Sequence, residues 1–232
     1  IWILLIMALY HLVLFSLRTN DKGKLWFGLF CLSIFVRALS SDVYLFYFFE
    51  RPSIRVFSWS VTFEHLSMYG GVFALFGFLK SSFPKIFGKW LSIFVFSINL
   101  GMMIFILIAN PIPIGKTLIV MNIFIPIFAS IVIVKLLIAG KSGEEDAFSF
   151  IVAICFLVGA SIHDMLVTQN ILPKPYMISY GIVTTIFFQS YIIAKSSAKA
   201  YKTAEKLGKD LEKEVLKKTD QIEGQYKDFK TL

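Results

Sequence analysis

The stretch WLSIFVFSINLGMMIFILIA, residues 90–109, contains no charged residue and is followed by Asn110-Pro111. A helix of about 20 residues spans the roughly 30 Å hydrocarbon core of a bilayer, and a helix satisfies its own backbone hydrogen bonds there. We therefore predict that this stretch crosses a membrane. Six more runs are predominantly apolar and are also predicted to cross the membrane, at residues 1–17, 25–49, 56–79, 117–139, 147–172 and 178–194.

The composition of the whole chain agrees with a membrane protein. Of its 232 residues, 57% are hydrophobic and 16% are charged, whereas soluble domains average about 45–50% apolar residues. Cys31 and Cys155 lie inside apolar runs, so they indicate neither a disulfide framework nor a CxxC metal site. We expect no metal and no cofactor. The predicted fold is all-α: a seven-helix transmembrane bundle over residues 1–194, with a C-terminal cytoplasmic coiled-coil helix over residues 195–232.

The basic residues predict how the chain is oriented in the membrane, because cytoplasmic loops carry an excess of Lys and Arg. With the N-terminus outside, the inner loops hold eight basic residues and the outer loops four. We therefore expect an outer N-terminus and a cytoplasmic C-terminus. The net charge of +8 comes from these loops and the tail, which favours membrane topology over nucleic-acid binding. The inner residues are Arg18, Lys22, Lys24, Lys80, Lys85, Lys89, Lys135 and Lys141, and the outer ones are Arg51, Arg55, Lys116 and Lys174.

From Lys195 onward the composition changes to Lys, Glu and Asp with isolated apolar residues. A 3-4 spacing runs through this tail, which is the pattern of a coiled-coil seam, although Gly208, Lys218 and Gln225 dilute it. We predict a parallel homodimer through this helix, and a lone solvated amphipathic helix is the alternative. The apolar seam positions are Tyr201, Ala204, Leu211, Val215, Ile222 and Phe229.

Several ionisable residues lie inside the predicted spans, where each costs about 2.5–3.5 kcal/mol at mid-helix on insertion scales. Counted from the outer helix ends at about 1.5 Å per residue, most of them fall in one layer. The long side chain of Arg37 reaches the same layer. We call this set the polar tier, and its members are Arg37, Asp42, Glu64, His65, His163 and Asp164.

Two interpretations of the polar tier remain open. In the first, it is a structural hydrogen-bonded network that joins three helices. In the second, it is a ligand or protonation site, because two His lie beside carboxylates and His changes charge near neutral pH. A transporter or an intramembrane metal-dependent enzyme that uses the same residues is a further alternative. The chain has no HExxH motif and no internal repeat in its support, and we expect no enzymatic activity in this segment.

Short motifs spread along the chain carry a resemblance to a known family. They are LWFGLFCL at residues 25–32, Arg37-Ala38-Leu39, Phe83-Pro84, Pro175-Tyr176, Gly181, Phe188-Gln189, Leu211-Glu212, Val215 and Lys218-Thr219. Together they resemble the bacterial seven-transmembrane receptors with diverse intracellular signalling modules. The resemblance covers nearly the whole chain, although most of its motifs are apolar.

The resemblance implies a receptor in the bacterial inner membrane, surrounded by lipid. It implies an extracytoplasmic sensor domain before residue 1 and a signalling output after residue 232, such as a histidine kinase, a diguanylate cyclase or a phosphatase. The chain begins Ile-Trp-Ile with no initiator Met, which is typical of a piece of a longer polypeptide. We therefore expect this segment to receive a signal, from a small molecule or from an extracytoplasmic domain, and to relay it inward.

Overall fold

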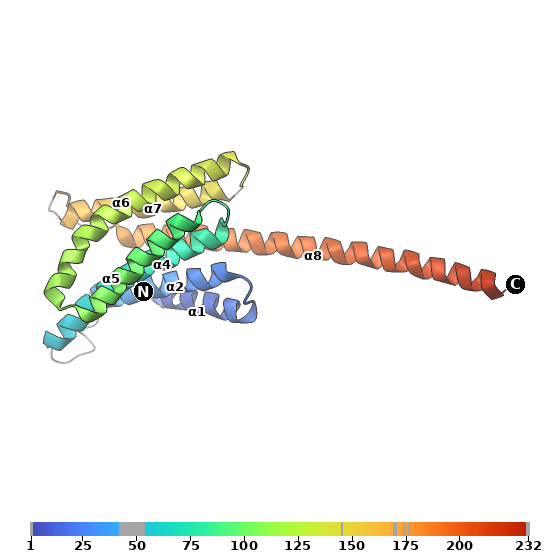
Figure 1. Ribbon diagram of the computed structural model, residues 1–232, viewed down its shortest axis with the longest axis horizontal. Helices are drawn as coiled ribbons and strands as arrows, with labels where there is room; N and C mark the ends of the chain where they lie inside the picture. Colours follow the sequence, from blue (N-terminus) through green and yellow to red (C-terminus); the bar gives the residue numbers. More distant parts are fainter. Residues whose placement is uncertain are drawn as a thin grey trace. The chain divides into compact units, whose positions relative to one another are not determined.

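The structure is a computed structural model (Figure 1). It describes residues 2–41, 54–144, 146–168, 171–173, 175 and 177–230, and within its helices it leaves out the side chains of residues 41, 165, 168, 179, 220 and 223–230. Throughout the described ranges the regular secondary structure is helical, which confirms the predicted all-α class. The helices, labelled as in Figure 1, are α1 (Trp2–Leu17), α2 (Lys22–Ser41), α4 (Ile54–Ser82), α5 (Lys89–Ile108), α6 (Pro111–Lys141), α7 (Ala147–Thr168) and α8 (Ile178–Lys230).

Four of these helices contain stretches that are long and apolar enough to cross a membrane. They are Lys22–Ser40, Lys89–Ile108, Pro111–Lys141 and Ala147–Asp164, in α2, α5, α6 and α7, and α1 is apolar but shorter. Each of the seven predicted spans overlaps one helix of the structure. The end of the second predicted span, including Asp42, lies outside the described residues.

The start of α6 differs from the prediction. The sequence predicts a loop through Pro111 and Pro113 and a helix from residue 117, whereas the helix begins at Pro111. The first N–H groups of a helix have no partner within it, so a proline there loses no hydrogen bond, and its ring already holds a helical φ. The two prolines therefore open the helix.

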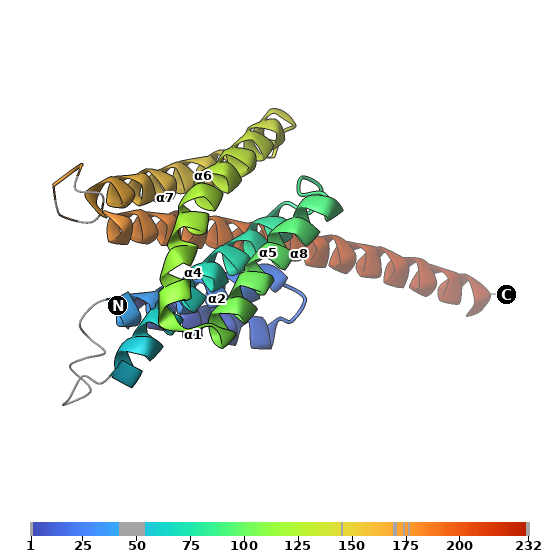
Figure 2. The same cartoon turned by 60° about the vertical axis from the view of Figure 1, so that its left-hand side comes forward.

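The described chain divides into two compact units between Ala139 and Gly140. In the first unit, α1 packs on α2, α2 on α4, and α4 on α5 (Figure 2). Residues without bulky side chains allow these close approaches. A Cβ atom on Gly28 of α2 would lie 3.0 Å from Cγ of Leu12 on α1. A Cβ atom on Gly77 of α4 would lie 2.3 Å from the Trp26 ring of α2.

Aromatic rings fill the space between α2, α4 and α5. The ring of Phe96 on α5 lies 4.7 Å from Phe73, 5.3 Å from Phe76 and 5.9 Å from Trp26, measured between centroids. Ring pairs at such separations contribute about 0.5–1.5 kcal/mol beyond the area that they bury. The Trp26 side chain that covers Gly77 therefore belongs to a cluster shared by three helices.

A buried hydrogen bond connects α4 to α6 in the same unit. The hydroxyl of Tyr69 donates to the backbone carbonyl of Thr117 over 3.1 Å, and both residues are buried. Met68, Ile106, Ile114 and Met121 surround this contact. The apolar surroundings make the hydroxyl dependent on this acceptor, because an unpaired polar group in such a place is costly.

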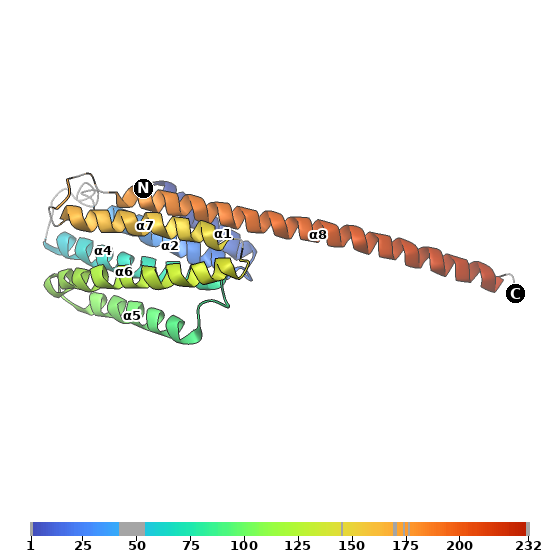
Figure 3. The same cartoon turned by 90° about the horizontal axis from the view of Figure 1, so that it is seen from above.

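The second unit is a hairpin of α7 and α8, which lie side by side (Figure 3). A Cβ atom on Gly181 of α8 would lie 2.6 Å from Cβ of Ala160 on α7, so only glycine fits this crossing. One turn further along α8, the hydroxyl of Thr185 contacts the carbonyl of Ala153 at 3.2 Å. α8 then continues unbroken through the predicted domain boundary at residue 194 as far as Lys230.

Candidate functional site

Two contacts show how α2 and α4 are aligned around the polar residues of the first unit. The hydroxyl of Ser60 on α4 donates to the backbone carbonyl of Ser40 on α2 over 2.7 Å. Further along, Ser33 of α2 lies against Gly70 of α4, where a Cβ atom would be 3.3 Å from the Ser33 hydroxyl oxygen. The two helices are therefore antiparallel and packed closely between these points.

Three members of the predicted polar tier lie between those two contacts. Arg37 is on α2 between residues 33 and 40, and Glu64 and His65 are on α4 between residues 60 and 70. The alignment of the helices therefore places Arg37 at the level of Glu64 and His65. The sequence count puts Arg37 deeper and brings only its long side chain to this layer, and that these residues form one site stays a prediction. Asp42, a fourth member, lies outside the described residues.

The ring of His65 has one nitrogen with a partner and one without. Its Nδ1 contacts the carbonyl of Val61, one turn earlier on α4, at 2.8 Å. Because a carbonyl only accepts, Nδ1 is the donor in this contact, and in the neutral imidazole Nε2 is then a hydrogen-bond acceptor. Nε2 is buried and has no hydrogen-bond partner within the described chain. A buried acceptor without a partner costs about 1–3 kcal/mol, so a water molecule or a ligand that donated to Nε2 would be stabilised.

The other two members of the tier, His163 and Asp164, lie near the end of α7 in the second unit. One carboxylate oxygen of Asp164 accepts from the backbone N–H of Met177, and the other accepts from that of Ile178 at 2.9 Å. Ile178 is the first residue of α8, so a side chain of α7 caps the next helix. A carboxylate is well suited to this place, since the first N–H groups of a helix lack partners and carry partial positive charge.

His163 touches the same carboxylate. Its Nδ1 lies 3.2 Å from Oδ1 of Asp164, the oxygen that also accepts from Met177. The side chain of His163 is 31% exposed and that of Asp164 is 14% exposed, so the carboxylate is the more enclosed group. A change in the charge or the contacts of His163 therefore acts directly on the oxygen that holds the start of α8. We call His163, Asp164 and the first residues of α8 the α8 cap.

A second polar contact joins α8 to the start of α7 at the other end of the hairpin. Nζ of Lys195 lies 2.8 Å from Oδ1 of Asp146. Both side chains are more than a third exposed, at 39% and 34%, so solvent screens this ion pair. The first part of α8, residues 178–195, is therefore held by the cap at its beginning, by Thr185 and Gly181 within it, and by this ion pair at its end.

His11 is a buried histidine that the sequence analysis missed. It lies on α1 with its ring edge-on to Phe27 of α2 at 4.5 Å between centroids. It is 2% exposed, and neither ring nitrogen has a hydrogen-bond partner among the residues that the structure describes. The signal was present, because His11 is the one His, Asp, Glu, Lys or Arg between residues 1 and 17.

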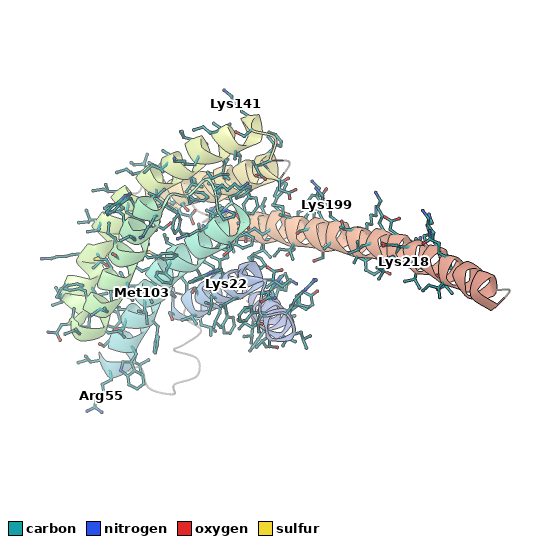
Figure 4. The ribbon with its side chains drawn as sticks, turned by 45° about the vertical axis from the view of Figure 1, so that its right-hand side comes forward. Lys22, Arg55, Met103, Lys141, Lys199 and Lys218 are labelled. Atoms are coloured by element: carbon teal, nitrogen blue, oxygen red, sulfur yellow. The ribbon has the colours of Figure 1, made fainter. Side chains whose placement is uncertain are left out.

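The predicted seam of the tail lies on the last part of α8. Tyr201, Leu211, Val215 and Ile222 are all 57–73% exposed, and Ala204 is exposed too. Phe229 is in the helix, but its side chain is outside the described set. Figure 4 shows the side chains of Lys199 and Lys218 extending away from this helix. The single chain therefore leaves the apolar positions of the seam uncovered.

Among the described residues, no three His, Cys, Asp or Glu side chains come together as a group that could hold a metal ion. Comparison with known proteins gave one finding. The family model described as 7TM diverse intracellular signalling matches residues 1–196. No curated protein and no solved structure matches the chain. The matched residues include every described helix from α1 to α7 and residues 178–196 of α8, and the chain therefore belongs to the 7TM diverse intracellular signalling family of transmembrane signalling receptors.

Proposed function

We propose that this segment receives a signal at the membrane and relays it through α8 to a fused cytoplasmic output module. The observation that carries the proposal is the continuity of α8, which runs from Ile178 to Lys230 as one helix. Its first turn is held by Asp164, and the first half of the helix packs on α7. A displacement at the α8 cap is therefore passed along a stiff element instead of being absorbed by a loop.

The α8 cap supplies a physical means of switching. While the carboxylate of Asp164 accepts from Met177 and Ile178, the start of α8 is fixed to the end of α7. A ligand or a proton that draws this carboxylate toward His163 weakens those two hydrogen bonds. The two arrangements of α8 then differ in free energy, and coupling between distant sites is typically about 1–3 kcal/mol. The segment itself is non-enzymatic in this proposal.

The rest of the polar tier is the second place where a signal can enter. Arg37, Glu64 and His65 share one level of the first unit, and Nε2 of His65 is a buried acceptor. This arrangement supports a site for a small molecule that donates a hydrogen bond. The other source of the signal is an extracytoplasmic domain that precedes this segment.

The surroundings of the relay follow from the same proposal. We place the segment in the bacterial inner membrane, with residue 1 outside and the tail in the cytoplasm, on the grounds of the loop charges. The output is a histidine kinase, a diguanylate cyclase or a phosphatase. The uncovered seam of α8 supports a parallel homodimer that brings two outputs together.

The test is the output of the full-length protein with the α8 cap altered. Asp164→Asn keeps the shape of the side chain but removes its charge and one acceptor, and His163→Gln removes the ring. We expect both variants to fold and to shift the basal output several-fold, because the start of α8 is less firmly held. Output activity and thermal stability in detergent are measured on the same preparations.

Asp21→Asn is the matched control, because it removes a carboxylate whose partner, Lys24, is in the first unit at 3.3 Å. It is expected to leave the output unchanged. Losses of output that follow losses of stability in all three variants would show that the α8 cap only stabilises the fold. An unchanged output in both cap variants would overturn the proposed relay through the α8 cap.

A further inference from the structure

The membrane part of α8 continues the seam of the tail without a change of phase. Counting back from Tyr201 in steps of four and three residues gives positions 197, 194, 190, 187, 183 and 180. Tyr180, Val183 and Phe187 occupy the outer three of these positions, and all are 63–68% exposed. One 3-4 register therefore runs from Tyr180 to Ile222, a length of about 63 Å at 1.5 Å per residue.

The exposed side of α8 is separate from the side that packs on α7. Gly181 and Thr185 make the close contacts with α7, and both are buried. The nearby residues that lie on the register, Tyr180, Val183 and Phe187, are exposed. A second copy can therefore bind this side of α8 without disturbing the hairpin.

Small residues stand where the register passes from the apolar part of α8 to its charged part. Positions 190, 194 and 197 are Ser, Ala and Ser, between the aromatic Phe187 and Tyr201. Ala194 and Ser197 are exposed, whereas Ser190 is half-buried with its hydroxyl enclosed by the chain. In membranes, small residues spaced in this way let two helices approach closely.

The charged residues of α8 also lie off the 3-4 register, with one exception. Of the eight lysines between residues 195 and 218, seven lie off the seam. The exception, Lys218, has its Nζ 3.0 Å from Oε1 of Glu214 on the same helix. Two parallel copies can therefore meet along this side without facing rows of like charge.

We propose that the homodimer contact is continuous, and that a second copy of this chain lies along α8 from Tyr180 through the membrane into the tail. The inference rests on the proposed coiled coil of the tail and extends it into the membrane. A strict heptad repeat drifts by about 20° per heptad on a straight helix, so the two copies wind around each other with a left-handed supercoil.

Disulfide cross-linking of the full-length protein in membranes tests this contact. Single cysteines are placed at Val183, Phe187 and Ala194 for the membrane part and at Val215 for the tail, in a background with Cys31→Ala and Cys155→Ala. We expect all four to link two copies several-fold faster than the controls. Thermal stability of each variant confirms that the fold is retained.

Cys155 is a built-in control for the membrane part. It is exposed and free on α7. It lies between Ala153, which contacts Thr185, and Phe156, whose carbonyl faces Gly181, so its depth is that of Val183. A Cys31→Ala variant that retains Cys155 therefore measures random collision at this level. Lys213→Cys serves the same purpose in the tail, because position 213 lies off the seam.

The outcomes separate this inference from the proposed function. Linking at Val215 with Val183 and Phe187 no faster than Cys155 would overturn the membrane contact, while the coil of the tail would stand. Equal linking rates at Val215 and position 213 would show that the tail has no defined seam. That result would overturn both the coiled coil of the tail and its extension along the first part of α8. Linking at all four seam positions above both controls supports the continuous contact.

Discussion

The two units of the chain are held together in different ways. In the first unit, α2 and α4 meet along their length through glycines, aromatic rings and buried hydroxyls, such as Gly77 beneath Trp26. In the second, α7 and α8 share close contacts in the middle, but their ends are joined by charged groups, Asp164 at one end and Lys195 at the other. The first arrangement resists displacement, whereas the second can be released at either end. In the proposed relay, this contrast assigns stability to the first unit and switching to the hairpin of α7 and α8.

The largest expected effect on stability is in the first unit. In Gly77→Ala the new methyl group would meet the Trp26 ring at 2.3 Å, and the ring belongs to the cluster that joins α2, α4 and α5. Overpacking of this kind costs about 1–3 kcal/mol. We expect a lower thermal midpoint in detergent and an output per folded molecule that is unchanged.

Gly101→Ala is the control for that change, because nothing lies within 4 Å of the added carbon on α5. Alanine is the better helix former by about 1 kcal/mol, so this variant should be at least as stable as the parent. Equal midpoints for the two alanine variants would mean that Trp26 moves aside at little cost, and the contrast between the units would be lost.

A smaller effect is expected from Tyr69→Phe. The change keeps the ring and removes the hydroxyl that donates to the carbonyl of Thr117. Hydrogen bonds between membrane helices contribute about 0.6 kcal/mol on average and up to about 1.7. Tyr10→Phe, on an exposed ring of α1, is the matched control and should leave the midpoint in place. A loss of output without a loss of stability would assign Tyr69 to the switch and contradict the division proposed here.

The smallest effect on stability is expected from Lys195→Met, which removes the ion pair with Asp146. Exposed ion pairs contribute about 0–1 kcal/mol and weaken as salt is added. We expect a slightly lower thermal midpoint at low salt and little difference at high salt. We also expect a clear shift in output, because α8 loses its ion pair with Asp146. Lys199→Met, one turn further along α8 and exposed, is the control. An output that responds equally to both changes would show that charge alone matters there.

The sequence predicts the helices well, because a backbone in hydrocarbon has few alternatives to a helix. It misplaces the start of α6, since Pro111 is compatible both with a loop and with the first turn of a helix. It also leaves out the packing of Trp26 on Gly77, because that contact depends on how α2 and α4 are aligned. Apolar patterns mark which residues are buried but do not specify which residues of two helices meet.

The contacts of the polar tier do not follow from the sequence, for a related reason. Counting along the helices places Arg37 deeper than Glu64 and His65, whereas the contacts of Ser40 with Ser60 and of Ser33 with Gly70 bring all three residues to one level. Counting does not predict that Asp164 caps α8, because this requires the turn between two helices to bring residue 177 back to it. Depth in the membrane follows from the distance along a helix, whereas a hydrogen-bond partner depends on the path of the loop.

The unbroken course of α8 makes its length as important as its composition. A residue added to a helix turns everything beyond it by about 100° and advances it by about 1.5 Å. In the proposed relay, residues inserted into the tail would therefore rotate a fused output module relative to the first part of α8. Only insertions of about seven residues return the seam to the same side. In that proposal, the distance between the membrane and the output module can change by whole heptads while the orientation of the module about the axis of α8 stays the same.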